Sequence, residues 1–166
     1  MISLRPMEKS DIAAITRWPP YRAGFAQMDY ALRENGWLEE FSEKPGTWCY
    51  IAVAEREPVG FSILSTTKKG EAEFRIALHP DWTGRGVGTK IAWSTLEQGF
   101  LRLGFDLIRL IVRKNNLPAR ALYEKLGIEV SGECTGLVQG QSIEFFEMSI
   151  DKQRFQHQTT RQDRRT

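Results

Sequence analysis

Three glycines at alternate positions, Gly84, Gly86 and Gly88, lie where a strand-like segment gives way to an amphipathic helix. Glycine has no Cβ, so it permits a positive φ angle and lets a ligand approach the backbone closely. The first N–H groups of a helix have no partner within the helix and carry the positive end of its dipole. The stretch is therefore suited to bind an anion, and most naturally a phosphate.

Two common phosphate motifs do not fit this glycine stretch. A dinucleotide fingerprint would continue from Gly84 and Gly86 to a third glycine or alanine, where this chain has Thr89. A P-loop would need a Gly-Lys-Ser/Thr sequence, which Gly88-Thr89-Lys90 does not supply. A purely structural loop is the simplest alternative for a glycine cluster taken alone, so the surrounding elements must decide.

A helix further along the chain carries three residues on one face. Asn116, Ala119 and Tyr123 are separated by three and four residues, a spacing that brings them to the same side of a helix. Pro118 suits the first turn of that helix, and Gly127 suits the position just after its end. By spacing alone, Asn116 could simply cap the helix and Tyr123 could simply pack it against a sheet.

The elements that must position these residues follow from the hydrophobic periodicity. Alternating apolar residues predict strands, and a repeat of 3.6 residues predicts helices. The predicted order is strand 2–5, helices 10–18 and 21–41, strands 48–55, 59–66 and 72–78, helix 87–103, strand 107–112, helix 115–127, and strands 129–138 and 142–150, with turns at 56–58, 68–70 and 139–141. The three strands before the glycine stretch form an antiparallel meander in this interpretation.

Local features add expectations for particular elements. Ser10 or Asp11 is suited to cap the first helix. The apolar run 107–112 is typical of a central strand covered on both faces. Residues 151–166 are polar and show no apolar period, so they are expected to form a short or frayed tail after a single domain of residues 1–150.

The bulk composition is that of an ordinary globular protein. The 166 residues are 41% hydrophobic and 27% charged, and the net charge of +2 is too small to favour nucleic acid as a partner. No segment resembles a signal peptide or a membrane span, so a cytoplasmic location is expected. The two cysteines, Cys49 and Cys134, have no neighbouring histidine in sequence and are expected to be reduced and buried.

Taken together, the order of elements and two motifs resemble the GNAT superfamily of N-acetyltransferases. The main signature of that family, Arg/Gln-x-x-Gly-x-Gly/Ala, falls on Thr83-Gly84-Arg85-Gly86-Val87-Gly88. Its second signature, an Asn, an Ala and a Tyr ahead of Leu-Gly, falls on residues 116–127. The resemblance covers the chain to about residue 150 and is strongest over residues 76–128. The family's usual Arg or Gln is Thr83 here, so backbone amides and Arg85 are expected to grip the pyrophosphate.

The resemblance implies an α/β (α+β) fold with one mixed, mostly antiparallel sheet of about seven strands and about four helices, in which a splayed strand pair holds the cofactor. It also implies acetyl-CoA as the cosubstrate and no metal. The cofactor-binding residues implied in this way are Ile76, Ala77, Leu78, Thr83, Gly84, Arg85, Gly86, Val87, Gly88, Thr89, Asn116 and Tyr123. The edge of strand 76–78 would pair with the pantetheine amides like an added strand.

The resemblance further implies Tyr123 as the general acid that protonates the leaving thiolate. An amine acceptor needs a base, because an alkylamine with a pKa of about 10.4 is almost entirely protonated at neutral pH. Glu73 is the first candidate, since the family often places a carboxylate near that position, although strand alternation also fits an exposed Glu73. His79 has a suitable pKa but precedes Pro80 at a strand end, where a structural role is more common.

The acceptor itself is open at this stage. Either a small-molecule amine or a protein N-terminus would serve, attacking acetyl-CoA directly in a ternary complex. Aromatic residues and a glutamate cluster in the N-terminal third are candidates for acceptor contacts or, equally, for core and solvated surface: Trp18, Tyr21, Phe25, Tyr30, Trp37, Glu39, Glu40 and Glu43. The alternative function is a non-catalytic acyl-CoA-binding or regulatory module, which would not need Tyr123. The expected assembly is a monomer or homodimer.

Overall fold

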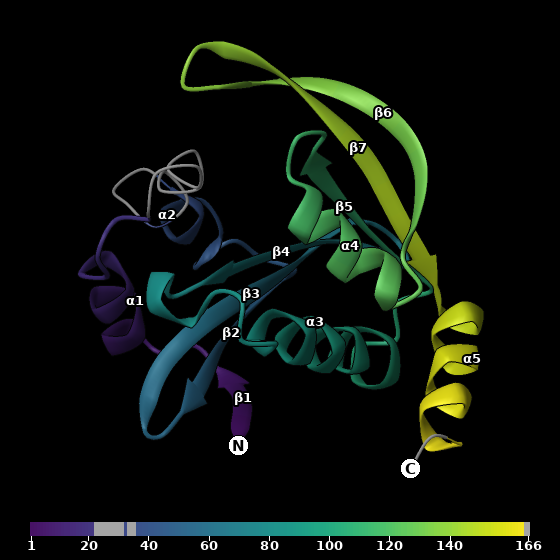
Figure 1. Cartoon of the computed structure of the whole chain (residues 1–166), viewed down its shortest axis with the longest axis horizontal. Coiled ribbons are helices and arrows are strands. Elements are labelled where there is room, and N and C mark those ends of the chain that lie inside the picture. Colours follow the sequence, from purple (N-terminus) through teal and green to yellow (C-terminus); the bar gives the residue numbers. More distant parts are fainter. Residues whose placement is uncertain (22–31, 33–35, 165–166) are drawn as a thin grey trace. The chain divides into compact units, whose positions relative to one another are not determined.

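The computed structural model describes residues 1–21, 32 and 36–164 of the chain (Figure 1). The elements in order are β1 (Ile2–Pro6), α1 (Lys9–Thr16), α2 (Trp37–Phe41), β2 (Thr47–Ala54), β3 (Glu57–Lys68), β4 (Glu71–Leu78), α3 (Val87–Glu97), β5 (Leu107–Arg113), α4 (Leu117–Lys125), β6 (Glu129–Val138), β7 (Gln141–Asp151) and α5 (Lys152–Asp163). Most of the predicted helix 21–41, with Phe25, Met28 and Tyr30, lies outside the described residues.

The seven strands are hydrogen-bonded in the order β1-β2-β3-β4-β5-β7-β6. Strands β4 and β5 run parallel, whereas the pairs β1–β2, β2–β3, β5–β7 and β6–β7 are antiparallel. The prediction of one mixed, mostly antiparallel sheet is therefore confirmed. The described residues hold five α-helices rather than about four, because α5 was not expected.

The chain divides into two compact units. The first contains Met1–Thr66 and Phe74–Thr95, and the second contains Thr67–Glu73 and Leu96–Thr166. Strand β4 thus contributes its first three residues to the second unit and the rest to the first. The prediction of a single domain over residues 1–150 stays a prediction.

In the first unit, two apolar clusters cover opposite faces of the strands. One contains buried side chains of α1, α2 and β2–β4, including Ile15, Phe41 and Phe61. The other contains Val87 and Ile91 of α3 packed against β2 and β3, with Ile76 and Leu78 of β4 partly buried beside them. Alternate residues of a strand point to opposite faces. Ile76 and Leu78, two residues apart on β4, accordingly lie on the same face, toward α3.

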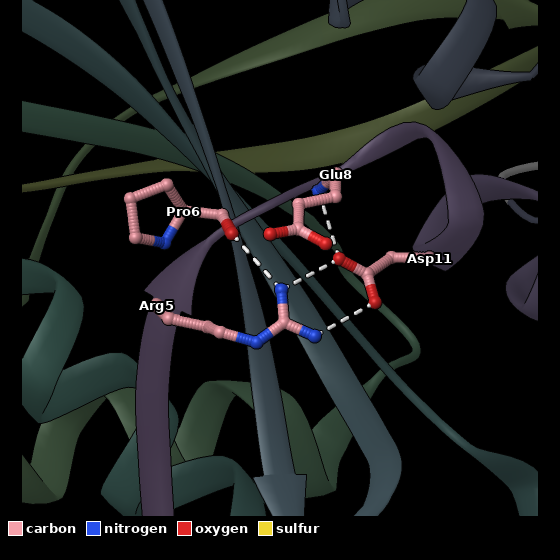
Figure 2. Close-up of polar contacts among 4 residues, drawn as sticks. All are labelled: Arg5, Pro6, Glu8 and Asp11. Carbon is pink, nitrogen blue, oxygen red and sulfur yellow. Dashed lines mark hydrogen bonds and ion pairs between the residues drawn. The ribbon is translucent and has the colours of Figure 1, made fainter.

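The joint between β1 and α1 is a network of polar contacts shown in Figure 2. The Arg5 guanidinium donates to both carboxylate oxygens of Asp11 at 2.7 and 2.9 Å, and the Glu8 N–H donates to Asp11 at 2.8 Å. Helix α1 begins at Lys9 after Glu8 as its N-cap, so the prediction of Ser10 or Asp11 as the cap is wrong. Asp11 instead occupies the third helical position and reaches back to the start of the helix.

The turn between β2 and β3 is shifted from its predicted place. It consists of Glu55 and Arg56, with φ angles of 51° and 68°, and β3 already begins at Glu57. Two residues with positive φ form the hairpin turn whose twist matches the flanking strands. Pro58, predicted to lie in the turn, pairs with Val53 inside the ladder next to an irregularity in register.

In the second unit, β5 is covered on only one face. Ile108, Leu110 and Val112 are buried, while Arg109 is exposed and Ile111 is 45% exposed. The prediction of a strand covered on both faces is therefore wrong. The sequence did not show this alternation of buried and exposed residues, because Ile111 is apolar although it lies on the exposed face.

The C-terminal residues form a helix rather than a frayed tail. Helix α5 spans Lys152–Asp163, and its Phe155 is 1% exposed and stacks on Phe100 with ring centroids 5.1 Å apart. The Asp151 carboxylate accepts the Arg154 N–H at 2.7 Å and so satisfies a donor at the start of the helix. Of the two alternatives, a frayed end is wrong for residues 152–163, because the buried Phe155 anchors an otherwise polar helix, whereas a short appendage agrees with the structure.

Two further features of the fold are its lack of a membrane-spanning helix among the described residues and the state of its two cysteines. None of the helices in the described part of the chain is long and apolar enough to cross a membrane. Cys49 and Cys134 are both free thiols, as predicted, but both are of intermediate exposure, so the prediction that they are buried is wrong. Burial raises the pKa of Cys49 to about 11, and burial is also the main cause that raises the pKa of Cys134.

Candidate functional site

The glycine stretch connects the end of β4 to the start of α3 in the first unit. After Leu78 the chain makes a short 3₁₀ turn over Pro80–Trp82, and α3 begins at Val87. Gly84 and Gly86 have φ angles of 73° and 78°, in the left-handed region. A Cβ at either position would meet nothing within 4 Å, so the space beside the turn is open. Glycine is needed here for its backbone angle, and the open space leaves room for a ligand.

The start of α3 presents backbone N–H groups to this open space. The Lys90 N–H donates to the Gly86 carbonyl at 3.5 Å, which makes it the first donor within the helix. The N–H groups of Val87, Gly88 and Thr89 precede it, so they have no acceptor inside the helix. Together with the left-handed glycines they form a set of donors at the positive end of a helix dipole. Such an arrangement is suited to bind phosphate oxygens.

Two side chains of this turn have different roles: Thr83 closes the turn, and Arg85 adds a positive charge. The Thr83 hydroxyl donates to the Pro80 carbonyl at 3.1 Å, so it stabilises the 3₁₀ turn. The Arg85 guanidinium lies over the Trp82 ring at 4.5 Å from its centroid, and Arg85 is exposed. A cation held over an aromatic ring loses less freedom when it binds an anion. Arg85 is therefore the cationic side chain placed at this turn.

The backbone N–H and C=O groups at the end of β4, just before the glycine turn, point to its two edges in alternation. The His79 N–H donates to the Val59 carbonyl of β3 at 2.9 Å. Backbone groups of successive strand residues point to opposite edges. Those of Ile76 and Leu78 therefore point away from β3, whereas Ala77 directs its carbonyl toward β3, close to Gly60. Ala77 also belongs to the buried core, so it lines the core rather than this edge.

The parallel pairing between β4 and β5 is short. Its residue pairs run from Glu71↔Leu107 to Glu73↔Arg109, although β4 continues to Leu78. Within the first unit, the Leu78 carbonyl accepts a hydrogen bond from the Tyr21 hydroxyl. A carbonyl oxygen has two lone pairs, so Leu78 can accept a second bond as well. Sequence reasoning missed this contact, because nothing local links two residues so far apart.

His79 has a structural role. Its Nδ1 atom accepts the Asp81 N–H at 3.0 Å, and its ring contacts that of Trp18 with centroids 5.0 Å apart. The imidazole thus caps the 3₁₀ turn that follows β4. Because Nδ1 accepts this bond, the neutral ring carries its proton on the other nitrogen. The arrangement favours the structural interpretation of His79 over that of a base.

In the second unit, α4 carries the predicted pair Asn116 and Tyr123. The Asn116 Oδ1 atom accepts the Ala119 N–H at 3.3 Å, so Asn116 is the N-cap of α4. Tyr123 is 8% exposed, and burial raises the pKa of its phenol above the ordinary value. The phenol therefore stays protonated throughout the neutral range. Burial disfavours the phenolate but leaves the O–H able to donate.

Glu73 lies at the end of the short β4–β5 ladder in the second unit. It is opposite Arg109 in register and points away from the face of buried Ala72. Both Glu73 and Glu147 of β7 contribute to the raised pKa of the Cys134 thiol, after the larger effect of burial. The register gives the same face to both carboxylates, because Glu73 lies opposite Arg109, and Arg109 lies opposite Ser149, two residues from Glu147. Glu147 and Arg109 could not be identified from sequence, because only the strand register brings them together.

The predicted site residues therefore form one set in each unit. The first unit brings together Ile76, Leu78 and residues 83–89, and the second holds Asn116 and Tyr123 on α4 and Glu73 on β4. Within the described residues, no group of three or more His, Cys, Asp or Glu side chains is arranged to hold a metal ion.

Comparisons with known proteins place these features in context. A model described as the acetyltransferase (GNAT) family matches residues 12–128. The chain is 28% identical to the spermidine N(1)-acetyltransferase of Escherichia coli (strain K12), over 95% of this chain and 87% of that protein. It is 26% identical to the L-amino acid N-acetyltransferase AaaT of the same organism, over 70% of this chain and 75% of that protein.

Solved structures show the same fold at low sequence identity. The spermidine N-acetyltransferase from Vibrio cholerae in complex with CoA and spermine aligns with a TM-score of 0.72 and 19% identity, covering 93% of this chain and 98% of that one. A chimera of that enzyme and hSSAT aligns with a TM-score of 0.78 and 21% identity, with the same coverage.

Proposed function

The chain belongs to the acetyltransferase (GNAT) family and is an acetyl-CoA-dependent N-acetyltransferase; from that premise we propose that it acetylates a small amine carrying more than one positive charge. The acetyl group passes by direct attack of the amine on the thioester in a ternary complex. The observation that supports this function most is the open glycine turn at the start of α3, which follows directly from a β4 edge with outward-pointing backbone groups.

In this proposal, residues of the first unit bind the cofactor. The N–H groups of residues 84–89 bind the pyrophosphate, and Arg85 adds a positive charge beside it. The backbone groups of Ile76 and Leu78 pair with the two amides of the pantetheine arm, as an added strand would. Thr83 contributes through its backbone, because its hydroxyl already bonds Pro80.

The second unit supplies the acid. When the amine attacks the thioester carbon, the C–S bond breaks and a thiolate leaves, with a pKa near 8.5 if it behaves as an ordinary thiol. The Tyr123 phenol is protonated at neutral pH, and burial raises its pKa further; it donates its proton or a hydrogen bond to that sulfur. Asn116 positions α4 as its N-cap, and the NH₂ of its side chain remains a donor for the pantetheine end.

The amine must lose a proton before it attacks. Keeping a group of pKa about 10.4 neutral at pH 7 costs roughly 4–5 kcal/mol, so a nearby base lowers the barrier. Glu73 is the proposed base, acting directly or through a water molecule. Its position on β4 and its half-buried environment fit this role.

The proposed acceptor class rests on the relatives and on exposed carboxylates. A spermidine acetyltransferase matches this chain over nearly its whole length. In the first unit, Glu39 and Glu40 lie exposed on α2, and Glu43 follows the helix. An exposed carboxylate contributes up to about 1 kcal/mol to binding a cation, or about fivefold in affinity. Two such contacts favour a polyamine over a monoamine.

A panel of acceptors tests this proposal. Spermidine, an alkyl monoamine, L-amino acids and a peptide with a free N-terminus are compared by kcat/KM with acetyl-CoA. We expect spermidine to be preferred, and Glu39→Gln combined with Glu40→Gln to lower its kcat/KM about threefold to tenfold. Glu97→Gln, which removes an exposed carboxylate of α3, is the control and should change nothing. Better use of the monoamine, amino acids or peptide would overturn the acceptor class and leave the family activity intact.

Two expectations from the sequence stay predictions within this proposal. One is a cytoplasmic location. The other is an assembly no larger than a homodimer, with no nucleic acid or membrane as partner.

A further inference from the structure

One arginine of helix α5 grips the residues that end α4. The Arg154 Nε atom donates to the Gly127 carbonyl at 2.6 Å, and its Nη2 atom forms an ion pair with Glu129 Oε1 at 2.8 Å. A guanidinium presents its N–H groups in a rigid fork, so the two contacts fix each other's geometry. The chain segment that leaves α4 is thus held at two points by a single side chain.

The gripped segment is bonded directly to Tyr123. The Tyr123 carbonyl accepts the N–H groups of Leu126 at 3.1 Å and Ile128 at 3.0 Å. Gly127 between them has a φ angle of 89°, as is usual for the residue that ends a helix. The carbonyl held by Arg154 therefore belongs to the same closing turn that begins at Tyr123. A shift of Gly127 would shift the last turn of α4 and the phenol with it.

Helix α5 is itself fixed against this turn. Phe155, the residue after Arg154, is fully buried and stacks on Phe100. The Gln158 side chain packs over Gly127 so closely that a Cβ there would lie 2.7 Å from Gln158 Nε2. The contact between α5 and the end of α4 is therefore close-packed as well as hydrogen-bonded, and Arg154 starts from a rigid base.

We propose that Arg154 is a positioning residue for the Tyr123 phenol, so that the C-terminal helix is part of the catalytic apparatus. This inference rests on the proposed role of Tyr123 as the acid. Arg154 does not touch the reacting atoms. It acts by fixing the backbone turn that carries Tyr123, and a displacement of about 1 Å in a reacting group can cost about 10²-fold in rate.

Four variants separate positioning from simple stabilisation. Arg154→Met keeps the aliphatic stem and removes both polar contacts. Arg154→Lys restores one charged donor without the fork. Glu129→Gln weakens the ion pair and leaves the Gly127 contact in place. Arg161→Met removes an exposed arginine from the last turn of the same helix and serves as the control.

The expected kinetic result is a split between kcat and KM. Arg154→Met should lower kcat by about fivefold to thirtyfold, part of the roughly 10²–10⁴-fold that a general acid supplies. Its KM for acetyl-CoA should stay within about twofold, because a positioning fault in the acid leaves ground-state binding intact. Arg154→Lys should recover part of the loss, Glu129→Gln should lower kcat by less than Arg154→Met does, and Arg161→Met should stay close to the unaltered protein.

A second readout does not depend on turnover. The phenolate absorbance of the protein minus that of Tyr123→Phe isolates the titration of Tyr123. In the unaltered protein this difference should stay flat as the pH passes through about 10, the ordinary value for tyrosine. In the Arg154→Met background it should begin to rise there, because a loosened turn lets water reach the phenol.

The outcomes decide between the two accounts. Unchanged kcat together with an unchanged Tyr123 titration in Arg154→Met would overturn the inference, even if the melting temperature fell. If Arg154→Met does not fold, Arg154→Lys is judged by the same two measurements. If Tyr123→Phe by itself leaves kcat intact, the acid assignment fails, while the titration still reports whether Arg154 positions the phenol.

Discussion

The Thr83 hydroxyl donates a hydrogen bond to the Pro80 carbonyl over 3.1 Å. The residue at the first position of the family motif is thus used to close the turn that leads into α3. The usual Arg or Gln would place a donor there for the pyrophosphate. In this chain the positive charge nearest in sequence is that of Arg85, whose guanidinium lies over the Trp82 ring. The cofactor grip is expected to depend on Arg85 more than on position 83.

Replacing Arg85 tests whether this side chain, rather than the residue at position 83, contributes to cofactor binding. Arg85→Gln should raise the KM for acetyl-CoA about threefold to tenfold with little change in kcat, because one exposed ion pair is worth about 1 kcal/mol or less. The effect should shrink at high salt, since exposed charges are screened. Arg17→Gln, at an exposed position after α1, is the matched control. An equal effect of both substitutions would remove the special role of Arg85.

The left-handed glycine at the start of α3 offers a second test with an internal control. Gly86 and Gly104 have φ angles of 78° and 75°, and a Cβ at either would meet nothing within 4 Å. Gly86→Ala and Gly104→Ala should therefore each cost about 1–2 kcal/mol of unfolding free energy from backbone strain. Only Gly86→Ala should also weaken acetyl-CoA binding, measured by calorimetry. Equal binding by both variants would contradict the assignment of this turn.

The contact between Arg5 and Asp11 gives the N-terminal joint a pH dependence. The hydrogen bond from Arg5 holds the pKa of the Asp11 carboxyl below its ordinary value. A depressed folded-state pKa adds stability above the ordinary value of about 3.9, and that stability is lost as the pH falls through the folded-state pKa. Asp11→Asn should thus cost about 1–3 kcal/mol at neutral pH and progressively less in acid, measured by urea unfolding.

The exposed pair Arg120–Glu124 supplies the comparison for that prediction. Its atoms are 2.9 Å apart, but the Glu124 side chain is 50% exposed against 7% for Asp11. Glu124→Gln should therefore change the unfolding free energy by about 0.5 kcal/mol or less at any pH. A loss for Asp11→Asn that does not depend on pH would show that packing, rather than charge, accounts for the contact.

The raised pKa of Tyr123 predicts the form of the pH–rate profile. Because burial favours the neutral phenol, the acid stays protonated beyond about pH 10, the ordinary value. The profile of kcat should therefore rise as the base and the amine lose their protons and should not fall again below about pH 10. A falling limb near pH 8 that disappears in Tyr123→Phe would contradict the environment described for this residue.

Sequence reasoning succeeded where the signal is local. The glycine turn, the N-cap Asn116 and the end of α4 at Gly127 follow from residue types whose backbone preferences are strong in any context. The individual strands followed from hydrophobic alternation, whereas the single mixed sheet was implied by the resemblance to the family. These features place the glycine turn and the helix that bears Tyr123 without reference to distant contacts.

The remaining features depend on contacts between distant residues. Helix α5 is mostly polar, and it docks through contacts that no local pattern reveals: the stack of Phe155 on Phe100 and the hydrogen bond from Arg154 to Gly127. The grouping of Glu73 with Arg109 and Glu147 depends on strand register, since a slip of one residue would reverse each face. The contact from Tyr21 to Leu78 is likewise set by tertiary folding.

The most direct test of the account is thiol release from acetyl-CoA, measured across the acceptor panel for the protein and for Tyr123→Phe. The account predicts turnover with at least one amine, and a loss of kcat well above tenfold in Tyr123→Phe with acetyl-CoA binding retained. A loss below tenfold would contradict the assignment of Tyr123 as the principal acid. Tight CoA binding without turnover on any acceptor would contradict catalysis and favour a binding module.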